Sequence, residues 1–489
     1  MSSLALLIGL SLAAGPAAPA TTPTVQQRVV AHVAPFEAAR RAVVGVSAVD
    51  VLTGQTLVAH RADEPLIPAS NQKLLTSAFA LVRLGADFRF ATGVFAWGPD
   101  LVVAGEFDPT LGDPRLAAER GVTIYAELDD WAAAVRKHAG GAVRDVIVCE
   151  PAHPPGRHPD WPEGQHQRWY AVPVGTLNFN DNCFDVRFVQ AAGGALTPVV
   201  EPQSRFLRVE NQLRSAPPHE WGLRCEDDDA TVVLTGRASR PSTEPMSVSV
   251  EQPGLLLGRA FAERLVRGGT AVNGRVRRAG PREVEWADAR PVAMTTTPLF
   301  VVMRRACKRS LNLAAEAMFL RAGDGTWAGS AEMMRRTLSE AYDLPAGSLR
   351  PADGGGLSRN NRVTPAAVTK VLSAVVVRPE GLLLLHSLPV AGVDGTLARR
   401  FGGSPCRGRV LAKTGYIRGV ATLSGYLLDD QSRPRVAFSI LVNGPGGILD
   451  PARRLQEGIC EVLLAGRPAG QRLNGPGHFA VAGALGSAP

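Results

Sequence analysis

The chain has 489 residues, of which 45% are hydrophobic and 20% are charged. This composition is typical of globular proteins and excludes a chain that is disordered over most of its length. The net charge is +8, but the basic residues form neither a block nor a stripe interleaved with aromatic residues, so no nucleic-acid partner is indicated.

The first 20 residues are typical of an export signal. An apolar stretch at 4–14 is followed by Ala18-Pro19-Ala20, which fits a small-residue cleavage site. No Lys or Arg precedes that stretch, so an apolar N-terminus without a signal function is the alternative. No apolar run reaches the roughly 20 residues that span a bilayer. We therefore expect an exported protein, periplasmic or associated with the cell wall, without a transmembrane segment.

The next segments carry a strand signal and then a helix signal. Residues 43–61 predict a β-hairpin, because two β-branched runs flank a turn signal at Thr53-Gly54. The stretch that starts near Ser70 has the apolar spacing of a helix, and Gly85 is its natural C-terminal stop. The N-terminal part of the chain is therefore expected to mix helix and strand.

The middle of the chain differs in composition from both ends. Residues 92–289 are rich in Pro, Gly and Arg and hold short strand-like runs at 143–150, 184–189 and 230–236. These features predict one or two inserted accessory domains that are mostly β.

The C-terminal half returns to strong periodic patterns. Helical spacing resumes at 298–323 and 331–342, and 409–443 predicts three antiparallel strands before a helix at 455–464. A sheet whose first hairpin is N-terminal and whose last strands are C-terminal requires residues 21–91 and 290–466 to fold together. The Gly-, Ala- and Pro-rich tail at 467–489 is expected to be disordered.

Six cysteines are spread over the chain without close spacing. They predict neither a disulfide framework nor a zinc site, although a single disulfide stays open. Cys307 lies in an apolar-periodic stretch and is expected in the core. His153, His158 and His166 lie in a Pro-rich loop and are expected at the surface. The sequence therefore indicates no metal and no cofactor.

Ser70-Asn71-Gln72-Lys73 forms an S-x-x-K motif at the predicted helix start. On a helix, positions i and i+3 share a face, so the amine of Lys73 can reach the hydroxyl of Ser70. A serine needs an adjacent base to act as a nucleophile, and a desolvated lysine beside another cation can be that base. The alternative is a helix-capping serine followed by a solvated lysine.

Two further motifs hold candidate site residues. Ser310-Leu311-Asn312 lies where one predicted helix ends and the next begins, so a hydroxyl and an amide can project together into a cleft. The alternative is that Ser310 or Asn312 only caps the next helix. Lys413-Thr414-Gly415 lies in a predicted strand, where glycine lets an extended substrate lie close. A solvated edge lysine before a glycine bulge is the alternative there.

The order of the three motifs decides between these alternatives. S-x-x-K, S-x-N and K-T-G follow one another on a helix start, an inter-helix loop and a strand, which is the signature of penicillin-binding proteins and β-lactamases. The chain resembles one such family, the D-alanyl-D-alanine carboxypeptidase/endopeptidases, or class C low-molecular-weight penicillin-binding proteins. The resemblance covers most of residues 40–465 and includes YAVPVGTLNFNDN (170–182), DGGGLSRNNRVTP (353–365) and AGVDGTLARRF (391–401).

The resemblance implies an α+β fold of the β-lactamase/DD-peptidase type, an antiparallel sheet with helices on both faces, plus a large insertion. It implies peptidoglycan stem peptides as substrates, β-lactam antibiotics as inhibitors and no cofactor. Ser70 would attack the carbonyl of the penultimate D-Ala and Lys73 would take its proton. The implied catalytic residues are Ser70, Lys73 and Ser310, and the implied substrate-binding residues are Asn312, Lys413, Thr414, Gly415 and Tyr416.

Three positions depart from the family pattern. Gly355 replaces the serine of D-G-S-G, and Phe107 opens F-D-P-T-L where G-D-P-T-L is usual. Tyr416 follows K-T-G where Ser or Thr is commoner, which affects recognition of the terminal carboxylate of the substrate.

Two other functions compete with this interpretation. A β-lactamase or esterase on the same scaffold is disfavoured by the long insertion and by the lack of an evident deacylating glutamate. A catalytically silent wall-binding protein is disfavoured by the intact Ser70 and Lys73.

Overall fold

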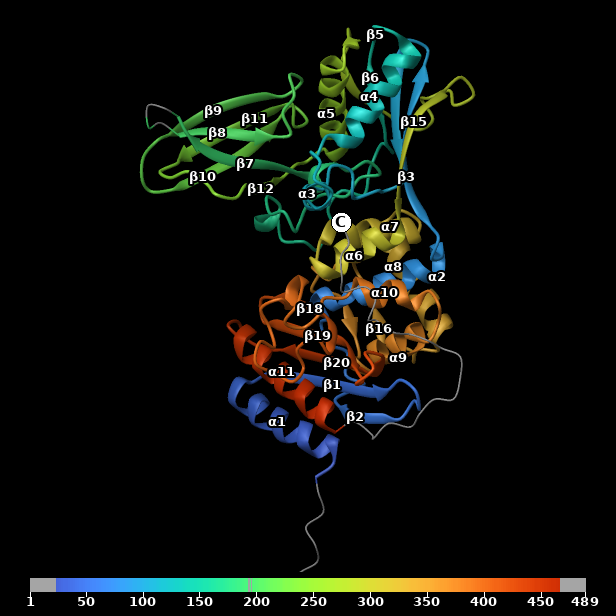
Figure 1. Ribbon diagram of the computed structural model, residues 1–489, viewed down its shortest axis with the longest axis vertical. Helices are drawn as coiled ribbons and strands as arrows, with labels where there is room; N and C mark the ends of the chain where they lie inside the picture. Colours follow the sequence, from blue (N-terminus) through green and yellow to red (C-terminus); the bar gives the residue numbers. More distant parts are fainter. Residues whose placement is uncertain (1–22, 192–193, 195, 467–489) are drawn as a thin grey trace, which may run out of the picture.

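The computed structural model describes residues 23–191, 194 and 196–466, so the expected signal at 1–20 and the expected tail at 467–489 lie outside the described residues. The described chain forms a lower and an upper part (Figure 1). The first and the last described helices lie together in the lower part. Within the described residues, no helix has the length and apolar character needed to cross a membrane.

One five-stranded antiparallel sheet organises the lower part. Its strands, in spatial order, are β18 (Val410–Ile417), β19 (Val420–Leu428), β20 (Pro434–Asn443), β1 (Val43–Asp50) and β2 (Thr56–His60). Strand β1 pairs with β20 along its whole length, from Val43 opposite Asn443 to Asp50 opposite Val436. The predicted N-terminal hairpin and the three predicted C-terminal strands therefore share one sheet, and β18 is at its edge.

Helices cover both faces of this sheet, which confirms the predicted α+β fold class. Leu441 of β20 belongs to the core beneath α2 (Gln72–Leu84) and α9 (Pro365–Val376). Its neighbour Ile440 packs on the other side with α1 (Val25–Arg40) and α11 (Leu449–Ala465). Every residue of β20 except the last is buried, because helices cover the strand on both faces.

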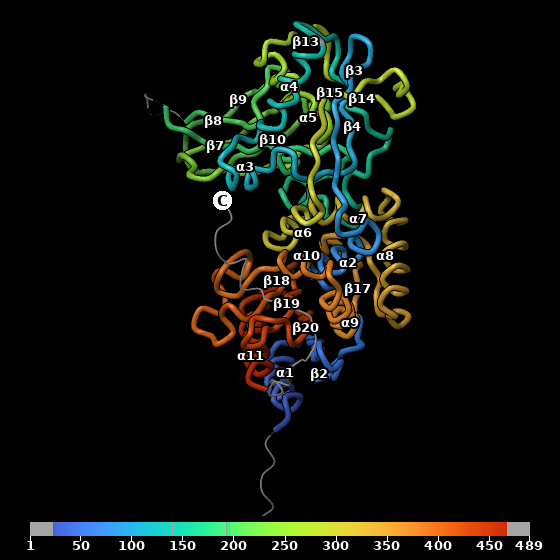
Figure 2. Tube along the Cα trace, turned by 45° about the vertical axis from the view of Figure 1, so that its right-hand side comes forward, coloured from blue at the N-terminus to red at the C-terminus, as the bar shows by residue number. Residues whose placement is uncertain are grey.

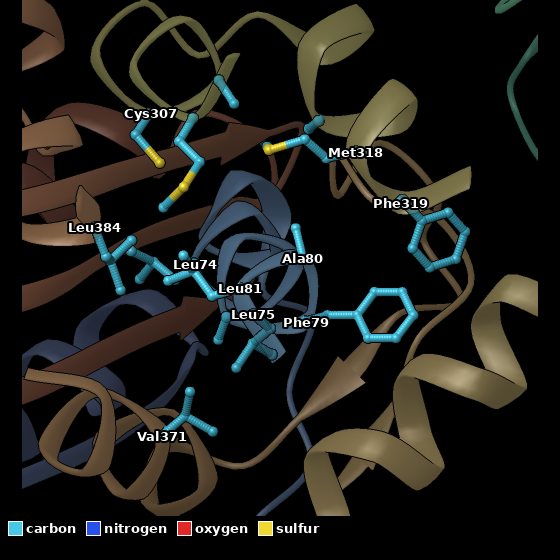
Figure 3. Packing of buried hydrophobic residues seen from close by; sticks show 14 of the residues in the cluster. Leu74, Leu75, Phe79, Ala80, Leu81, Cys307, Met318, Phe319, Val371 and Leu384 are labelled. Carbon is cyan, nitrogen blue, oxygen red and sulfur yellow. The ribbon is translucent and has the colours of Figure 1, made fainter. Parts of the chain in front are cut away.

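Helix α2 runs through the larger of the two cores of the lower part (Figure 3). Its Leu74, Leu75 and Phe79 are buried, and the rings of Phe79 and Phe319 lie 6.4 Å apart. Each buried side chain of this size contributes about 1.5–3 kcal/mol to stability, so the helix behind the S-x-x-K motif is held firmly. The surrounding helices are α6 (Leu299–Lys308), α7 (Asn312–Ala322), α8 (Trp327–Tyr342), α9 and α10 (Gly381–Ser387).

Two long antiparallel strands, β3 (Arg89–Trp97) and β15 (Arg290–Pro298), connect the parts (Figure 2). The pair starts before residue 92 and ends after residue 289, so it extends beyond the expected bounds of the insertion at both ends. Both strands belong to a five-stranded sheet in the order β14-β6-β4-β3-β15, against which α4 and α5 pack. The other members are β4 (Asp100–Gly105), β6 (Val146–Cys149), β14 (Val276–Ala279), α4 (Ala126–Ala139) and α5 (Pro253–Arg267).

Two three-stranded sheets complete the upper part, in the orders β10-β11-β9 and β12-β7-β8. The three strand-like runs seen in the sequence correspond to β6, β7 and β11. These sheets comprise β7 (Cys183–Gln190), β8 (Leu196–Glu201), β9 (Arg208–Arg214), β10 (Glu220–Glu226), β11 (Thr231–Arg237) and β12 (Met246–Ser249). The short elements are β5 (Ala142–Val143), β13 (Ala271–Val272), β16 (Leu349–Arg350), β17 (Arg362–Val363) and the one-turn helices η1 (Ala69–Asn71), η2 (Glu163–Gln165), η3 (Asn180–Asn182) and η4 (Gly395–Leu397).

Several helices were not predicted from the sequence. Helix α1 buries only Val29 and Val33, so its apolar spacing is weak. The upper part also holds α3 (Pro114–Arg120) besides α4 and α5. Helix α5 buries most of its residues, and its apolar spacing was a usable signal inside a region that otherwise reads as β.

Candidate active site

Ser70 lies at the centre of η1, a single turn that leads directly into α2. The preceding Ala69 has a φ of 44°, in the left-handed region, which costs of order 1–3 kcal/mol for a residue with a side chain. A Cβ at Gly356 would lie 1.8 Å from the carbonyl oxygen of Ala69, so only glycine fits against this turn. The surrounding chain therefore fixes the turn that carries Ser70, with the backbone strain at Ala69.

The amine of Lys73 lies one helical turn from Ser70, as the motif predicted. Its Nζ is 3.1 Å from Ser70 Oγ, 2.6 Å from Asn312 Oδ1 and 2.6 Å from the carbonyl oxygen of Gly355. The side chain is fully buried, and this burial lowers the pKa of Lys73 to about 8. A neutral amine has two N–H groups, which can donate to Asn312 Oδ1 and to the carbonyl oxygen of Gly355. Its lone pair then faces the hydroxyl of Ser70.

The loop between α6 and α7 brings Ser310 and Asn312 to the same place. Ser310 has a φ of 59°, a second left-handed residue at the site. Asn312 is the first residue of α7, but its side chain does not cap the helix. Its Oδ1 accepts a hydrogen bond from Lys73, and its Nδ2 donates to the carbonyl oxygen of Tyr170 at 2.6 Å. No side chain caps this helix end, so the interpretation of these residues as simple caps is wrong.

Lys413 is fully buried although it belongs to the edge strand β18. Its Nζ donates to Ser310 Oγ at 2.9 Å and to the carbonyl oxygen of Thr414 at 2.6 Å. Burial, and after it the charge of Lys73, lowers the pKa of Lys413 well below its ordinary value. The alternative of a solvated edge lysine is therefore wrong. Each of the two buried lysines contacts one of the two serines.

Gly415 lets strand β18 pack against the turn that carries Ser70. A Cβ at this position would lie 2.2 Å from Thr422 Oγ1 and 2.9 Å from the backbone nitrogen of Ser70. No residue larger than glycine fits there. The neighbouring Thr414 Oγ1 lies 2.8 Å from Thr396 Oγ1 of η4.

Two cavities meet at Ser70. One, of about 390 Å³, lies between the α6–α7 loop, residues 162–170 and the end of β18. The other, of about 360 Å³, lies between β18, η4 and the start of α11. Ser70, Ser310 and Tyr416 line both, and Tyr416 is 50% exposed. The site thus has room on two sides of Ser70, as the cleavage of a bond between two peptide segments requires.

A buried carboxylate beneath the site was missed in the sequence. Both oxygens of Glu316 in α7 accept hydrogen bonds of 2.7 Å, from the backbone N–H groups of Gly354 and Gly355. Burial, and after it the neighbouring Asp353, raises the pKa of Glu316 well above its ordinary value. The same burial lowers the pKa of Lys73, so the interior favours the neutral form of both groups. The usable signal was a lone acid inside a helix whose other positions are almost all apolar.

Two of the departures from the family pattern have structural consequences. A Cβ at Gly355 would lie 2.5 Å from Glu316 Oε1, so glycine leaves room for this carboxylate. Phe107 has a φ of 69°, in the region that favours the glycine usual at this position, and its ring is buried in the lower core.

One histidine expected at the surface is buried instead. His158 is 9% exposed, with ring centroids 6.4 Å from Trp161 and 5.2 Å from Trp327. The expectation failed because its Pro-rich loop folds onto α8. Cys307 is buried in the core as predicted, and no disulfide is formed within the described chain. Among the described residues, no group of three or more His, Cys, Asp or Glu is placed to hold a metal ion.

Comparisons with known proteins find relatives in sequence and in fold. The chain is 32% identical over 439 residues to a D-alanyl-D-alanine carboxypeptidase of Actinomadura sp. (strain R39), covering 83% of this chain and 78% of that protein. Its fold is similar to that of penicillin binding protein 4 (dacB) from Haemophilus influenzae, with a TM-score of 0.73, 22% identity, and 89% of this chain and 99% of that chain covered. The same protein complexed with a β-lactam gives a TM-score of 0.68 and 21% identity, with 88% and 99% covered.

The match to a protein family extends over nearly all of the described chain. Residues 25–461 match the D-Ala-D-Ala carboxypeptidase 3 (S13) family. This range contains all three motifs and both parts of the fold, and it confirms the resemblance seen in the sequence. The chain therefore belongs to the D-Ala-D-Ala carboxypeptidase 3 (S13) family.

Proposed function

We propose that the protein is a serine D-Ala-D-Ala carboxypeptidase and endopeptidase that cleaves peptidoglycan stem peptides and cross-links. The observation that carries this proposal is the buried amine of Lys73, 3.1 Å from Ser70 Oγ and oriented by two carbonyl oxygens. A serine hydroxyl paired with a base of lowered pKa is an activated nucleophile for acyl transfer.

In the acylation step, Ser70 attacks the carbonyl carbon of the penultimate D-Ala and its proton passes to Lys73. The backbone N–H groups of Ser70 and Tyr416 form the oxyanion hole, an interaction worth several kcal/mol in the transition state. The close approach of β18 to η1, which Gly415 permits, supports this pairing of donors.

In the same step the leaving amine needs a proton. Ser310 relays it: its hydroxyl, held by a hydrogen bond from the buried Lys413, donates its own proton to the amine and regains the proton that Lys73 took from Ser70. Asn312 positions the peptide, while Lys413 and Thr414 engage the carboxylate side of the substrate. Water then releases the acyl group from Ser70.

A β-lactam would acylate Ser70 in the same way, but its opened ring stays attached to the acyl group and blocks water. Inhibition by these antibiotics therefore belongs to the proposal. So does a location outside the cytoplasm, in the periplasm or at the cell wall, which the predicted export signal at 1–20 supports.

The test uses the protein with a peptide that ends in D-Ala-D-Ala, with and without prior exposure to benzylpenicillin. We expect free D-alanine to be released, and a single dose of benzylpenicillin to stop the release. A wall-binding protein without activity would release none. A β-lactamase would hydrolyse the benzylpenicillin and soon recover, and either result would contradict the proposal.

The rate of acylation is expected to depend on pH through Lys73. Since the neutral amine is the base, and burial lowers the pKa of Lys73 to about 8, the rate should rise as pH increases towards 8 and level off above it. Below the pKa, the slope is about tenfold per pH unit. The second-order rate constant for a penicillin, measured from pH 5.5 to 9.5, reports this value for the free enzyme. A rate that is flat from pH 6 to 9 would show that Lys73 is not the base.

Tyr416 is expected to favour cross-linked substrates. Its phenol cannot replace the short hydroxyl that helps to hold a terminal carboxylate, and its half-exposed ring lies where the two cavities meet. Tyr416→Thr should raise kcat/KM for short D-Ala-D-Ala peptides relative to cross-linked dimers. The measurement compares both substrates in both variants, and an unchanged ratio would show that the side chain does not contact substrate.

A further inference from the structure

A cleft of about 970 Å³ has no part in the catalytic steps proposed for Ser70 and Lys73. Its walls come from α3, the loop at 164–170, β10, β12 and the C-terminal end of α6. A volume of this size accommodates a ligand of its own, beyond the cavity of about 390 Å³ beside Ser70.

The cleft is positively charged. Arg115, Arg168 and Arg309 line it, all three are exposed, and none forms an ion pair within 4.0 Å with a described carboxylate. At its floor, the buried Arg305 contacts both Asp113 and Asp181, a cluster with one carboxylate in excess. Three unpaired guanidinium groups outweigh that single charge, so the cleft favours an anionic ligand with more than one carboxylate.

The cleft is also continuous with the active site. Trp169 and Tyr170 line both the cleft and the cavity beside Ser70, and Leu311 of the cleft is the residue between Ser310 and Asn312. Trp169, which is 45% exposed, and Met246, which is 50% exposed, add apolar surface next to the arginines. A ligand with alkyl segments between its carboxylates matches these walls.

We propose that this cleft binds the second stem peptide of a cross-linked dimer, held by its carboxylates while the first peptide is cleaved at Ser70. The inference rests on the proposed function and goes beyond it by assigning the recognition of cross-linked substrate to Arg115, Arg168 and Arg309. A stem peptide is acidic and is joined covalently to the scissile segment, so its carboxylates lie within reach of a cleft that adjoins the active site.

The test is the triple variant Arg115→Gln, Arg168→Gln and Arg309→Gln, assayed on three substrates. These are a cross-linked muropeptide dimer, a monomeric pentapeptide muropeptide and an N-acylated tripeptide that ends in D-Ala-D-Ala. The matched control is Arg214→Gln, Arg240→Gln and Arg282→Gln, which removes the same charge from exposed positions of the upper part outside the cleft. The melting temperature of each variant is recorded to show that it folds.

We expect kcat/KM for the dimer to fall about tenfold or more in the cleft variant and to stay constant in the control, since each exposed charge contact is worth about two- to fivefold. Rates for the tripeptide, for the monomer and for acylation by benzylpenicillin should not change. An equal loss of kcat/KM for the monomer would show that the cleft binds the stem peptide that is cleaved at Ser70. An unchanged kcat/KM for the dimer would show that the cleft binds neither stem peptide. Either result overturns the inference, whereas a wild-type protein inactive on all three substrates would refute the proposed function itself.

Discussion

Replacing Lys73 by alanine is expected to lower the rate constant of acylation at saturating substrate by about 10²–10⁴-fold, the range for loss of a general base. The reason is the contact of its Nζ with Ser70 Oγ at 3.1 Å, which no other described side-chain amine or imidazole makes. Lys73→Met is the matched variant, because it keeps the buried aliphatic chain and removes only the amine. Stopped-flow measurements with a chromogenic cephalosporin give the acylation rate constant of both variants.

Lys413→Ala separates binding from proton transfer. Lys413 contacts Ser310 and the carbonyl oxygen of Thr414, and in the proposed mechanism it engages the carboxylate side of the substrate. Such an interaction is made in both the ground and the transition state. We expect the loss to appear mainly in KM, by about 10–100-fold for a charged hydrogen bond. Equal losses of the saturating acylation rate in the Lys73 and Lys413 variants would contradict this division of roles.

Glu316→Ala is expected to have the second large effect, on stability and on the site together. It leaves the N–H groups of Gly354 and Gly355 without their acceptors in a fully buried place, at a cost of about 2–5 kcal/mol. For a unit the size of the lower part, this corresponds to a drop in Tm of about 4–10 °C. The carbonyl oxygen of Gly355 also orients Lys73, so acylation should slow as well.

Glu316→Gln is the control for that experiment. It preserves the shape of the side chain and one of the two acceptor oxygens, so about half of the loss in Tm is expected. Thermal unfolding, followed by circular dichroism, gives the Tm of the wild type and of both variants. If both variants have the same Tm as the wild type, Glu316 does not hold the loop at 353–356 in place.

The sequence predicted those parts of the fold and site whose signals are local. The hairpin at 43–61 and the C-terminal strands were recognised because β-branched runs alternate with turn residues, and the contact between Ser70 and Lys73 follows from helical spacing alone. The sharing of one sheet by the two ends of the chain followed from strand signals at both ends, separated by a region that looks inserted.

The missed features depend on contacts distant in sequence. Nothing local indicates that the Glu316 carboxylate accepts from a loop 38 and 39 residues away, or that His158 packs against Trp327. The left-handed φ of Ser310 likewise has no signal in its residue type, since serine does not favour that region. Helix α1 was missed because two buried valines in 16 residues give no clear period.

The site of covalent attachment is the most direct test of the central claim. The protein is treated with benzylpenicillin, digested with trypsin and analysed by tandem mass spectrometry, with Ser70→Ala treated in parallel. The account predicts one adduct, on Ser70, and none in the variant. An adduct on Ser310 or on any other residue, or labelling that persists in Ser70→Ala, would contradict it.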